Sequence, residues 1–227
     1  MNEINRELTR YREMMYRLLS SVYINEIDAD MLEALREIEF PDLSGNGGDA
    51  EQELQAGFDL VKNALAAFDG KNGDETAELL EDLAADYAKT FLAAGDAAGK
   101  AAFPYESVYT GTDSAFCGSV QMQLNALYAA KGLQMKKDMF AIMEDHIGLE
   151  LGYMAEMLKK QAEAGSTEEA ETLGREIRRF FNEHLANWTG QFAADVYKYS
   201  DREFYKGFAR VTRGFMEAEK QFTAEEE

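Results

Sequence analysis

Apolar residues recur along this chain at spacings of three and four positions, the period of an α-helix with one buried face. The clearest run follows spacings of four, three and four through Ile147, Leu151, Met154 and Leu158. The same period marks residues 4–22, whereas alternating stretches rich in Val, Ile and Thr are missing. The pattern therefore predicts an all-α fold, a single globular bundle of about nine to eleven helices.

Stretches that contain glycine or proline separate the predicted helices. The helices are expected near residues 4–22, 30–39, 51–68, 79–91, 113–130, 144–165, 167–199 and 201–219. Gly132 is the expected C-cap after residue 130, and Ser166 or Thr167 the expected N-cap of the following helix. The Gly/Ala-rich residues 94–104 are the best candidate for a hinge.

Length and composition favour one folded domain over residues 1–227, since 227 residues with 46% hydrophobic content can bury a substantial core. Two lobes, residues 1–93 and 104–220 with a hinge at 94–103, are the alternative. Cys117, the single cysteine, is expected to be a small buried hydrophobe. Neither an apolar signal core at the N-terminus nor a membrane-length apolar segment is evident, which favours a cytoplasmic location.

The formal net charge is −20, from 23 Lys and Arg against 43 Asp and Glu. Such a charge argues against a nucleic-acid partner, because phosphates attract cationic surfaces. It permits a basic partner, which a negative field would steer inward. Solubility alone is the simpler explanation of the charge.

A polar triplet, Glu144-Asp145-His146, precedes the apolar run that begins at Ile147. The triplet sits at a helix start, where backbone N–H groups lack partners and the helix dipole favours carboxylates. Chemistry, ligand binding and helix capping all fit this position. If it only caps, Asp145 would cap the helix and His146 would bond to the preceding loop.

Catalytic motifs are missing around the two histidines. A di-iron bundle needs Glu-x-x-His units, but Met143 precedes His146 by three positions and Phe181 precedes His184 by three. One cysteine and two histidines 38 positions apart do not make a zinc site. Nucleophile elbows, phosphate loops and dinucleotide fingerprints are also missing from the sequence. We therefore predict that the protein is not an enzyme and holds no metal.

Two further segments combine aromatic and polar residues. Residues 103–111 hold Tyr105, Glu106 and Tyr109 in an irregular stretch, which suits either a peptide groove or a cover over helix ends. Residues 180–188 hold His184 beside an apolar stripe that includes Trp188. This stripe is interpreted as core, with His184 as a structural histidine.

Taken in order, these segments resemble the TorD/DmsD/NarJ family of molybdoenzyme-maturation chaperones. The resemblance covers about residues 80–215 and rests on five segments. They are Asp86-Tyr87-Ala88-Lys89-Thr90-Phe91-Leu92, Pro104-Tyr105-Glu106-Ser107-Val108-Tyr109, Asp145-His146-Ile147-Gly148-Leu149-Glu150-Leu151, Phe181-x-x-His184-Leu185-x-x-Trp188, and Phe204-Tyr205-x-x-Phe208-Ala209. The family's Glu-Pro-x-Asp-His hallmark is altered, because Ile142 and Met143 replace its Glu-Pro.

The resemblance implies a TorD-like helical bundle without catalytic activity. It implies binding of the signal peptide or N-terminal region of a DMSO-reductase-type molybdoenzyme, with help in cofactor insertion before twin-arginine export. Carboxylates would pair with the leader's arginines, and aromatic and Met side chains would receive its apolar part. The predicted peptide-binding residues are Tyr105, Ser107, Tyr109, Asp145, His146, Glu106, Glu144 and Glu150.

The expected partners are the catalytic subunit of a molybdopterin oxidoreductase and its leader peptide, with no nucleic acid and no stable membrane insertion. We expect no cofactor; binding of molybdopterin or a guanine nucleotide stays open, as does the choice between a monomer and a helix-swapped dimer. One alternative is a NarJ-like assembly chaperone for a non-exported subunit. Others are a small acid–base enzyme using Asp145 and His146, and a structural adaptor.

Overall fold

The computed structural model describes residues 3–45, 47–95, 100–111, 118–133 and 142–225. These residues form ten α-helices and no β-strand, which confirms the predicted all-α fold. None of the described helices is long and apolar enough to cross a membrane. Cys117 lies outside the described residues.

The chain forms two compact units, and each unit combines segments that are far apart in sequence. Met1–Ile24 and Pro104–Trp188 form the first unit, and Asn25–Phe103 and Thr189–Glu227 form the second. The expectation of one domain, with two lobes as the alternative, stays a prediction. Residues 96–99 of the expected hinge lie outside the described residues.

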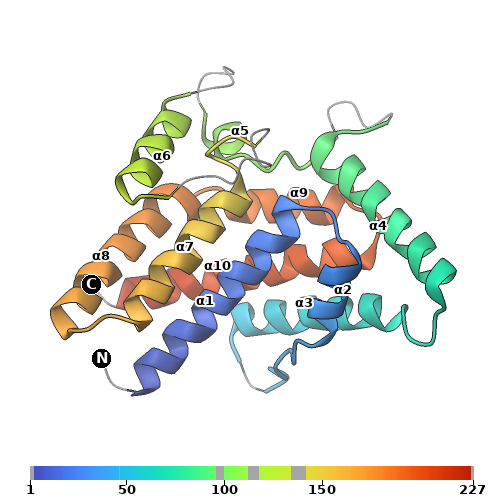
Figure 1. Ribbon diagram of the computed structural model, residues 1–227, viewed down its shortest axis with the longest axis horizontal. Coiled ribbons are helices and arrows are strands. Elements are labelled where there is room, and N and C mark those ends of the chain that lie inside the picture. The colour runs from blue at the N-terminus through green and yellow to red at the C-terminus, as the bar shows by residue number, and fades with distance from the viewer. Residues whose placement is uncertain (1–2, 46, 96–99, 112–117, 134–141, 226–227) are drawn as a thin grey trace. The chain divides into compact units, whose positions relative to one another are not determined.

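Helices α1 and α7 form the centre of the first unit and lie side by side (Figure 1). The helices of this unit are α1 (Glu3–Ile24), α5 (Glu106–Thr110), α6 (Ser119–Ala130), α7 (Ile147–Ala162) and α8 (Thr167–Phe180). A Cβ on Gly148 would lie 2.2 Å from Cγ1 of Ile24, so only glycine allows this approach. The Ser20 hydroxyl donates to the Gly148 carbonyl at 2.7 Å and fixes the contact.

The apolar stripe predicted on α7 is buried along its whole length. The stripe predicted on α1 is buried in the second half of that helix, but Leu8 is 43% exposed. Among residues 6–13, the part of the first half whose side chains the structure describes, the buried ones are Thr9 and Arg12. One residue turns an α-helix by about 100°, so the buried face near Thr9 is rotated from the predicted one.

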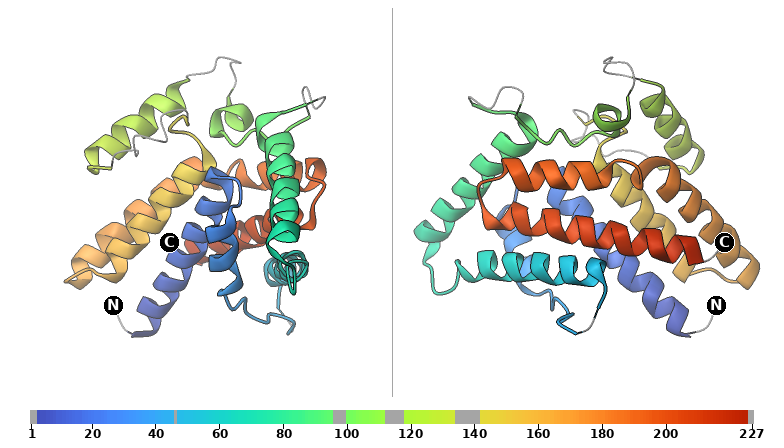
Figure 2. Two further views of the ribbon diagram at one scale, coloured as in Figure 1. Left: turned by 45° about the vertical axis from the view of Figure 1, so that its right-hand side comes forward. Right: turned by 180° about the vertical axis from the view of Figure 1, so that it is seen from behind.

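The second unit is built on a close crossing of α3 and α10. Its helices are α2 (Ala29–Arg36), α3 (Asp49–Ala66), α4 (Gly73–Leu92), α9 (Thr189–Tyr199) and α10 (Glu203–Glu225). A Cβ on Gly207 would lie 2.9 Å from the Val61 nitrogen, and one on Gly214 would lie 2.7 Å from the Leu54 nitrogen. Residue numbers fall along α3 as they rise along α10, so the two helices are antiparallel, as the right panel of Figure 2 shows.

A buried carboxylate joins α4 to the turn between α9 and α10. Asp86 accepts hydrogen bonds from the backbone N–H groups of Asp201 at 2.8 Å and Arg202 at 2.9 Å. Five residues further along α4, the ring of Phe91 meets that of Tyr205 edge to face, with centroids 5.6 Å apart. The first and last segments of the family resemblance therefore pack together within this unit.

The caps predicted at Ser166 and Gly132 are confirmed, but the single helix predicted over residues 167–199 is wrong. Ser166 is the N-cap of α8 and accepts the Glu169 N–H at 3.2 Å, and Gly132 follows α6 with φ +70°. The predicted long helix is divided by a π-helical turn, η2 (Phe181–Leu185), before α9 begins. The aromatic stripe continues through this turn at helical spacing, which is why the sequence pattern conceals it.

Candidate functional site

The two polar motif segments of the first unit are joined through their backbones. Tyr105 and His146 form an isolated antiparallel β-bridge. The Glu106 N–H donates to the Asp145 carbonyl at 2.9 Å, and a second 2.9 Å bond runs from the first residue of α7 back to the carbonyl of residue 104. The loop before α5 and the loop before α7 therefore form one junction, although they are about 40 residues apart in sequence.

Asp145 and His146 each cap a helix at this junction. The His146 Nδ1 accepts the Gly148 N–H at 3.0 Å, so His146 is the N-cap of α7. The Asp145 Oδ2 accepts the Ser107 N–H at 3.1 Å, in the first turn of α5. The capping alternative is wrong about which residue caps α7, because His146 and not Asp145 immediately precedes the helix and Asp145 points to α5. The bond of His146 to the preceding loop is confirmed, since its N–H donates to the Met143 carbonyl at 3.0 Å.

Burial changes the acid–base properties of His146. Its side chain is 3% exposed, and the Tyr105 ring meets it edge to face at 5.1 Å. Removal from water disfavours the charged imidazolium and lowers the pKa of His146 to about 4. At neutral pH the ring is therefore uncharged and free to accept a hydrogen bond.

Beneath the junction lies a buried group of three polar side chains that sequence reasoning did not bring together. The His184 Nδ1 lies 3.0 Å from Oε2 of Glu106, and both side chains are buried. Glu150 is fully buried, and neither of its carboxyl oxygens has a hydrogen-bond partner. Its burial and the nearby carboxyl of Glu106 raise the pKa of Glu150 well above its ordinary value, which favours a protonated, neutral Glu150.

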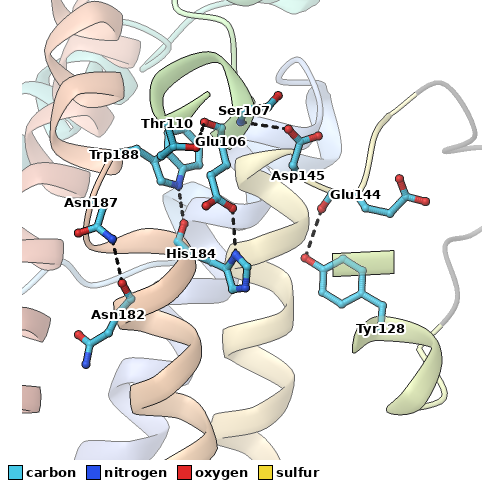
Figure 3. Close-up of polar contacts among 10 residues, drawn as sticks. All are labelled: Glu106, Ser107, Thr110, Tyr128, Glu144, Asp145, Asn182, His184, Asn187 and Trp188. Carbon is cyan, nitrogen blue, oxygen red and sulfur yellow. Dashed lines mark hydrogen bonds and ion pairs between the residues drawn. The ribbon is translucent and has the colours of Figure 1, made fainter. Parts of the chain in front are cut away.

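The π-helical turn supplies the third motif segment to the same place. The turn sets the carbonyl of His184 to accept the indole N–H of Trp188. The Trp188 ring stacks on Tyr109 with centroids 5.4 Å apart. Figure 3 shows His184 reaching Glu106 from this turn while Trp188 lies close to α5. π-Helical turns occur frequently at functional sites, because the extra residue redirects side chains.

Glu144 lies at the outer edge of the junction and holds α6. One carboxylate oxygen accepts the side-chain amide of Gln121 and the other that of Asn125, each at 2.8 Å. The Tyr128 hydroxyl donates to the backbone carbonyl of Glu144 at 3.3 Å, as Figure 3 shows. Sequence reasoning missed these partners, although amides four positions apart on a predicted helix share one face.

Comparison with known proteins decides the family. Residues 51–194 match the family described as "Nitrate reductase delta subunit". The chain belongs to this family. The predicted resemblance to the TorD/DmsD/NarJ chaperones of molybdoenzyme maturation is confirmed, and the family is one of maturation chaperones rather than catalysts.

Relatives named "Chaperone protein TorD" match nearly the whole chain. The protein from Shewanella pealeana is 27% identical over 231 residues, which cover 99% of this chain and 94% of the relative. The protein from Photobacterium profundum is 27% identical over 217 residues and covers 95% of each chain. The protein from Shewanella loihica is 29% identical over 210 residues, covering 89% of this chain and 88% of the relative. The similarity thus extends beyond the predicted residues 80–215.

In this family member the eight predicted peptide-binding residues fall into two sets. Tyr105, Ser107, Tyr109 and Glu144 are partly exposed. The buried set comprises Glu106, Asp145, His146 and Glu150, each at most 4% exposed. All eight lie at or beneath one junction, and their role in peptide binding stays a prediction. Among the described residues, no three His, Cys, Asp or Glu side chains are grouped as metal ligands.

Proposed function

We propose that this protein is a cytoplasmic chaperone that binds the twin-arginine leader of a DMSO-reductase-type molybdoenzyme. It holds the enzyme back from export while the molybdenum cofactor is inserted, and it needs no cofactor of its own. The client is the catalytic subunit of a molybdopterin oxidoreductase. Membership of the maturation-chaperone family supports this proposal.

The observation that carries the proposal is the partly exposed Glu144 at the junction of the motif segments, whose two carboxylate oxygens each accept a side-chain amide. A leader arginine presents two parallel N–H donors, which match the two oxygens of a carboxylate. The partly exposed rings of Tyr105 and Tyr109 and the 46% exposed Val108 lie on the loop and helix joined to it. These side chains offer contact area for the apolar residues that follow the arginines. The net charge of −20 speeds encounter with a basic leader.

The buried residues act in this proposal as positioning residues. Asp145 and His146 cap α5 and α7 and thereby fix the loop on which Glu144 stands. The contact between Glu106 and His184 ties α5 to the π-helical turn. Variants of this set should therefore lower stability and affinity together. A variant of Glu144, which also loses its contacts to α6, should lower affinity more than stability.

Calorimetric titration with synthetic twin-arginine leaders from molybdoenzymes of the same organism tests the proposal. Glu144→Gln should weaken binding about 10-fold, the loss of about 1.4 kcal/mol expected when a hydrogen bond to a charged group goes. Glu171→Gln, an exposed glutamate on α8, makes the same charge change away from the junction and should leave affinity unchanged. A failure of every leader to bind at low salt would refute the proposal, and equal losses in the two variants would remove Glu144 from the site.

A second candidate is an assembly chaperone for a catalytic subunit that is not exported, as the matching family's description as a nitrate reductase delta subunit suggests. Such a client would lack a twin-arginine leader, and the chaperone would bind another part of its N-terminal region. Affinity purification of the tagged chaperone, followed by mass spectrometry, separates the two. A molybdoenzyme partner whose gene encodes no leader supports this second candidate and contradicts the first.

A further inference from the structure

The side-chain amides of two α6 residues bind the Glu144 carboxylate, one at each oxygen. The Gln121 amide donates to one oxygen and the Asn125 amide to the other, each at 2.8 Å. One N–H donor per carboxylate oxygen is also how a guanidinium group binds a carboxylate in bidentate fashion. The two side chains together therefore imitate the donor pair of one arginine, but without its positive charge.

A buried apolar side chain accompanies these amides on α6. Leu124, next to Asn125 in sequence, is fully buried, whereas Met122 on the same helix is 73% exposed. The first seven residues of α6, called its first half below, thus bury one apolar side chain and present two N–H donors. An arginine followed by apolar residues offers the same two kinds of contact within one short segment.

The second half of α6 is attached by different contacts. The Tyr128 hydroxyl reaches a backbone carbonyl, and the Tyr128 ring packs against Tyr153 of α7 with centroids 5.5 Å apart. Just after the helix, Lys131 forms an ion pair with Glu176 of α8 at 2.5 Å. Loss of the Glu144 contacts would therefore release the first half of the helix and leave the second half in place.

We propose that the first half of α6 is an internal substitute for the client, which an arginine side chain displaces from Glu144. This inference rests on the proposed function, because it takes the arginine-bearing leader as the ligand. A guanidinium replaces the two neutral amides because it adds a full positive charge to the same hydrogen-bond pattern. Displacement also frees the site of Leu124 for an apolar residue of the leader. The unliganded chaperone thus keeps its binding site covered.

Removal of the internal occupant tests this inference directly. The double variant Gln121→Ala, Asn125→Ala should bind a twin-arginine leader on the order of 10-fold more tightly than the wild type, because the competing hydrogen bonds are gone. Gln123→Ala, an exposed amide on the same helix, is the matched control and should leave affinity unchanged. Equal or weaker binding by the double variant, with its thermal unfolding unaltered, would overturn the inference while the proposed function stands.

Hydrogen exchange distinguishes failure of the inference from failure of the proposed function. Addition of N-acetyl-Arg-Arg-amide to the wild type should speed exchange of the backbone amides of residues 122–125, the first in α6 with helical acceptors, and leave that of residues 128–131 unchanged. N-acetyl-Lys-Lys-amide is the control, since an ammonium group lacks the paired donors. Faster exchange with the arginine probe supports displacement even if no full leader binds. Unchanged exchange with that probe overturns displacement, whatever the leaders do.

Discussion

Protonation of His146 should make the stability of this protein depend on pH in a predictable way. The ring is buried and its Nδ1 accepts a hydrogen bond from α7, so the folded state favours neutral imidazole. The pKa is about 4 in the folded protein, against an ordinary value of 6.5. Between these values the unfolded chain binds a proton that the folded protein does not, so the free energy of unfolding falls as the pH falls.

The size of this effect follows from the difference in pKa. A shift of about 2.5 pKa units corresponds to about 3.4 kcal/mol once the pH is well below 4. The loss is about 1.4 kcal/mol at pH 5.5 and about 2.5 kcal/mol at pH 4.5, and it is negligible at pH 7.5. The contribution of His146 is therefore complete above pH 7 and declines through the window from 6.5 to 4.

The variant His146→Asn removes this titrating group. Asparagine is a favoured N-cap residue and does not titrate, so it preserves the cap on α7 while removing the pH-dependent cost. Urea unfolding of both proteins at pH 7.5, 5.5 and 4.5 gives the difference between their unfolding free energies. The contributions of the other titrating groups cancel in this difference, because both proteins contain them. The variant should gain about 2.5 kcal/mol on the wild type between pH 7.5 and 4.5. A difference that does not change with pH would refute the assignment of His146 as a buried neutral cap.

Three further substitutions test the packing described above. Glu150→Gln should raise the free energy of urea unfolding at pH 8, and this gain should shrink toward pH 5. The reason is that the raised pKa of Glu150 keeps the folded carboxyl protonated while the unfolded one ionises as the pH rises. A loss of stability at pH 8 would contradict this. Asp86→Ala should lower the free energy of unfolding by about 3 kcal/mol, because two backbone N–H groups lose their acceptor. Asp82→Ala, which breaks an exposed ion pair, should lower it by less than about 1 kcal/mol. Equal losses would argue against the Asp86 cap. Gly207→Ala should lower the free energy of unfolding by about 1–3 kcal/mol, because the added Cβ would overlap α3. At Gly190 an added Cβ meets nothing within 4 Å, so Gly190→Ala should raise the free energy of unfolding by up to about 1 kcal/mol. Similar shifts in melting temperature would refute the close crossing.

Helical periodicity predicted the fold because burial follows the helix period in most of this chain. The stripe from Ile147 to Leu158 is buried as expected, and the caps at Ser166 and Gly132 depend only on local sequence. The turn at residues 181–185 escaped prediction because a π-helical turn adds a residue without breaking the aromatic stripe. Leu8 is exposed because the buried face near the start of α1 is rotated.

The candidate site was predicted as a set of segments but not as a geometry. Sequence reasoning placed Glu144, Asp145 and His146 at a helix entrance, where the structure also places them. Apart from local contacts such as that of His146 with Gly148, their partners lie 16 to 41 positions away, and no local pattern encodes such pairing. For the same reason Glu106, expected to face a ligand, is buried against His184. One usable signal was overlooked: Gly207 and Gly214, seven positions apart on one helix face, mark the close crossing with α3.

Whether the chaperone binds a molybdoenzyme through the Glu144 junction is tested most directly by identifying what it retains in the cell. The tagged wild type and Glu144→Gln are purified in parallel from the native host, and their partners are quantified by mass spectrometry. We expect a molybdopterin oxidoreductase with a twin-arginine leader to be enriched with the wild type and depleted several-fold with the variant. A wild-type sample that contains no molybdoenzyme, or equal enrichment by both proteins, would contradict the account.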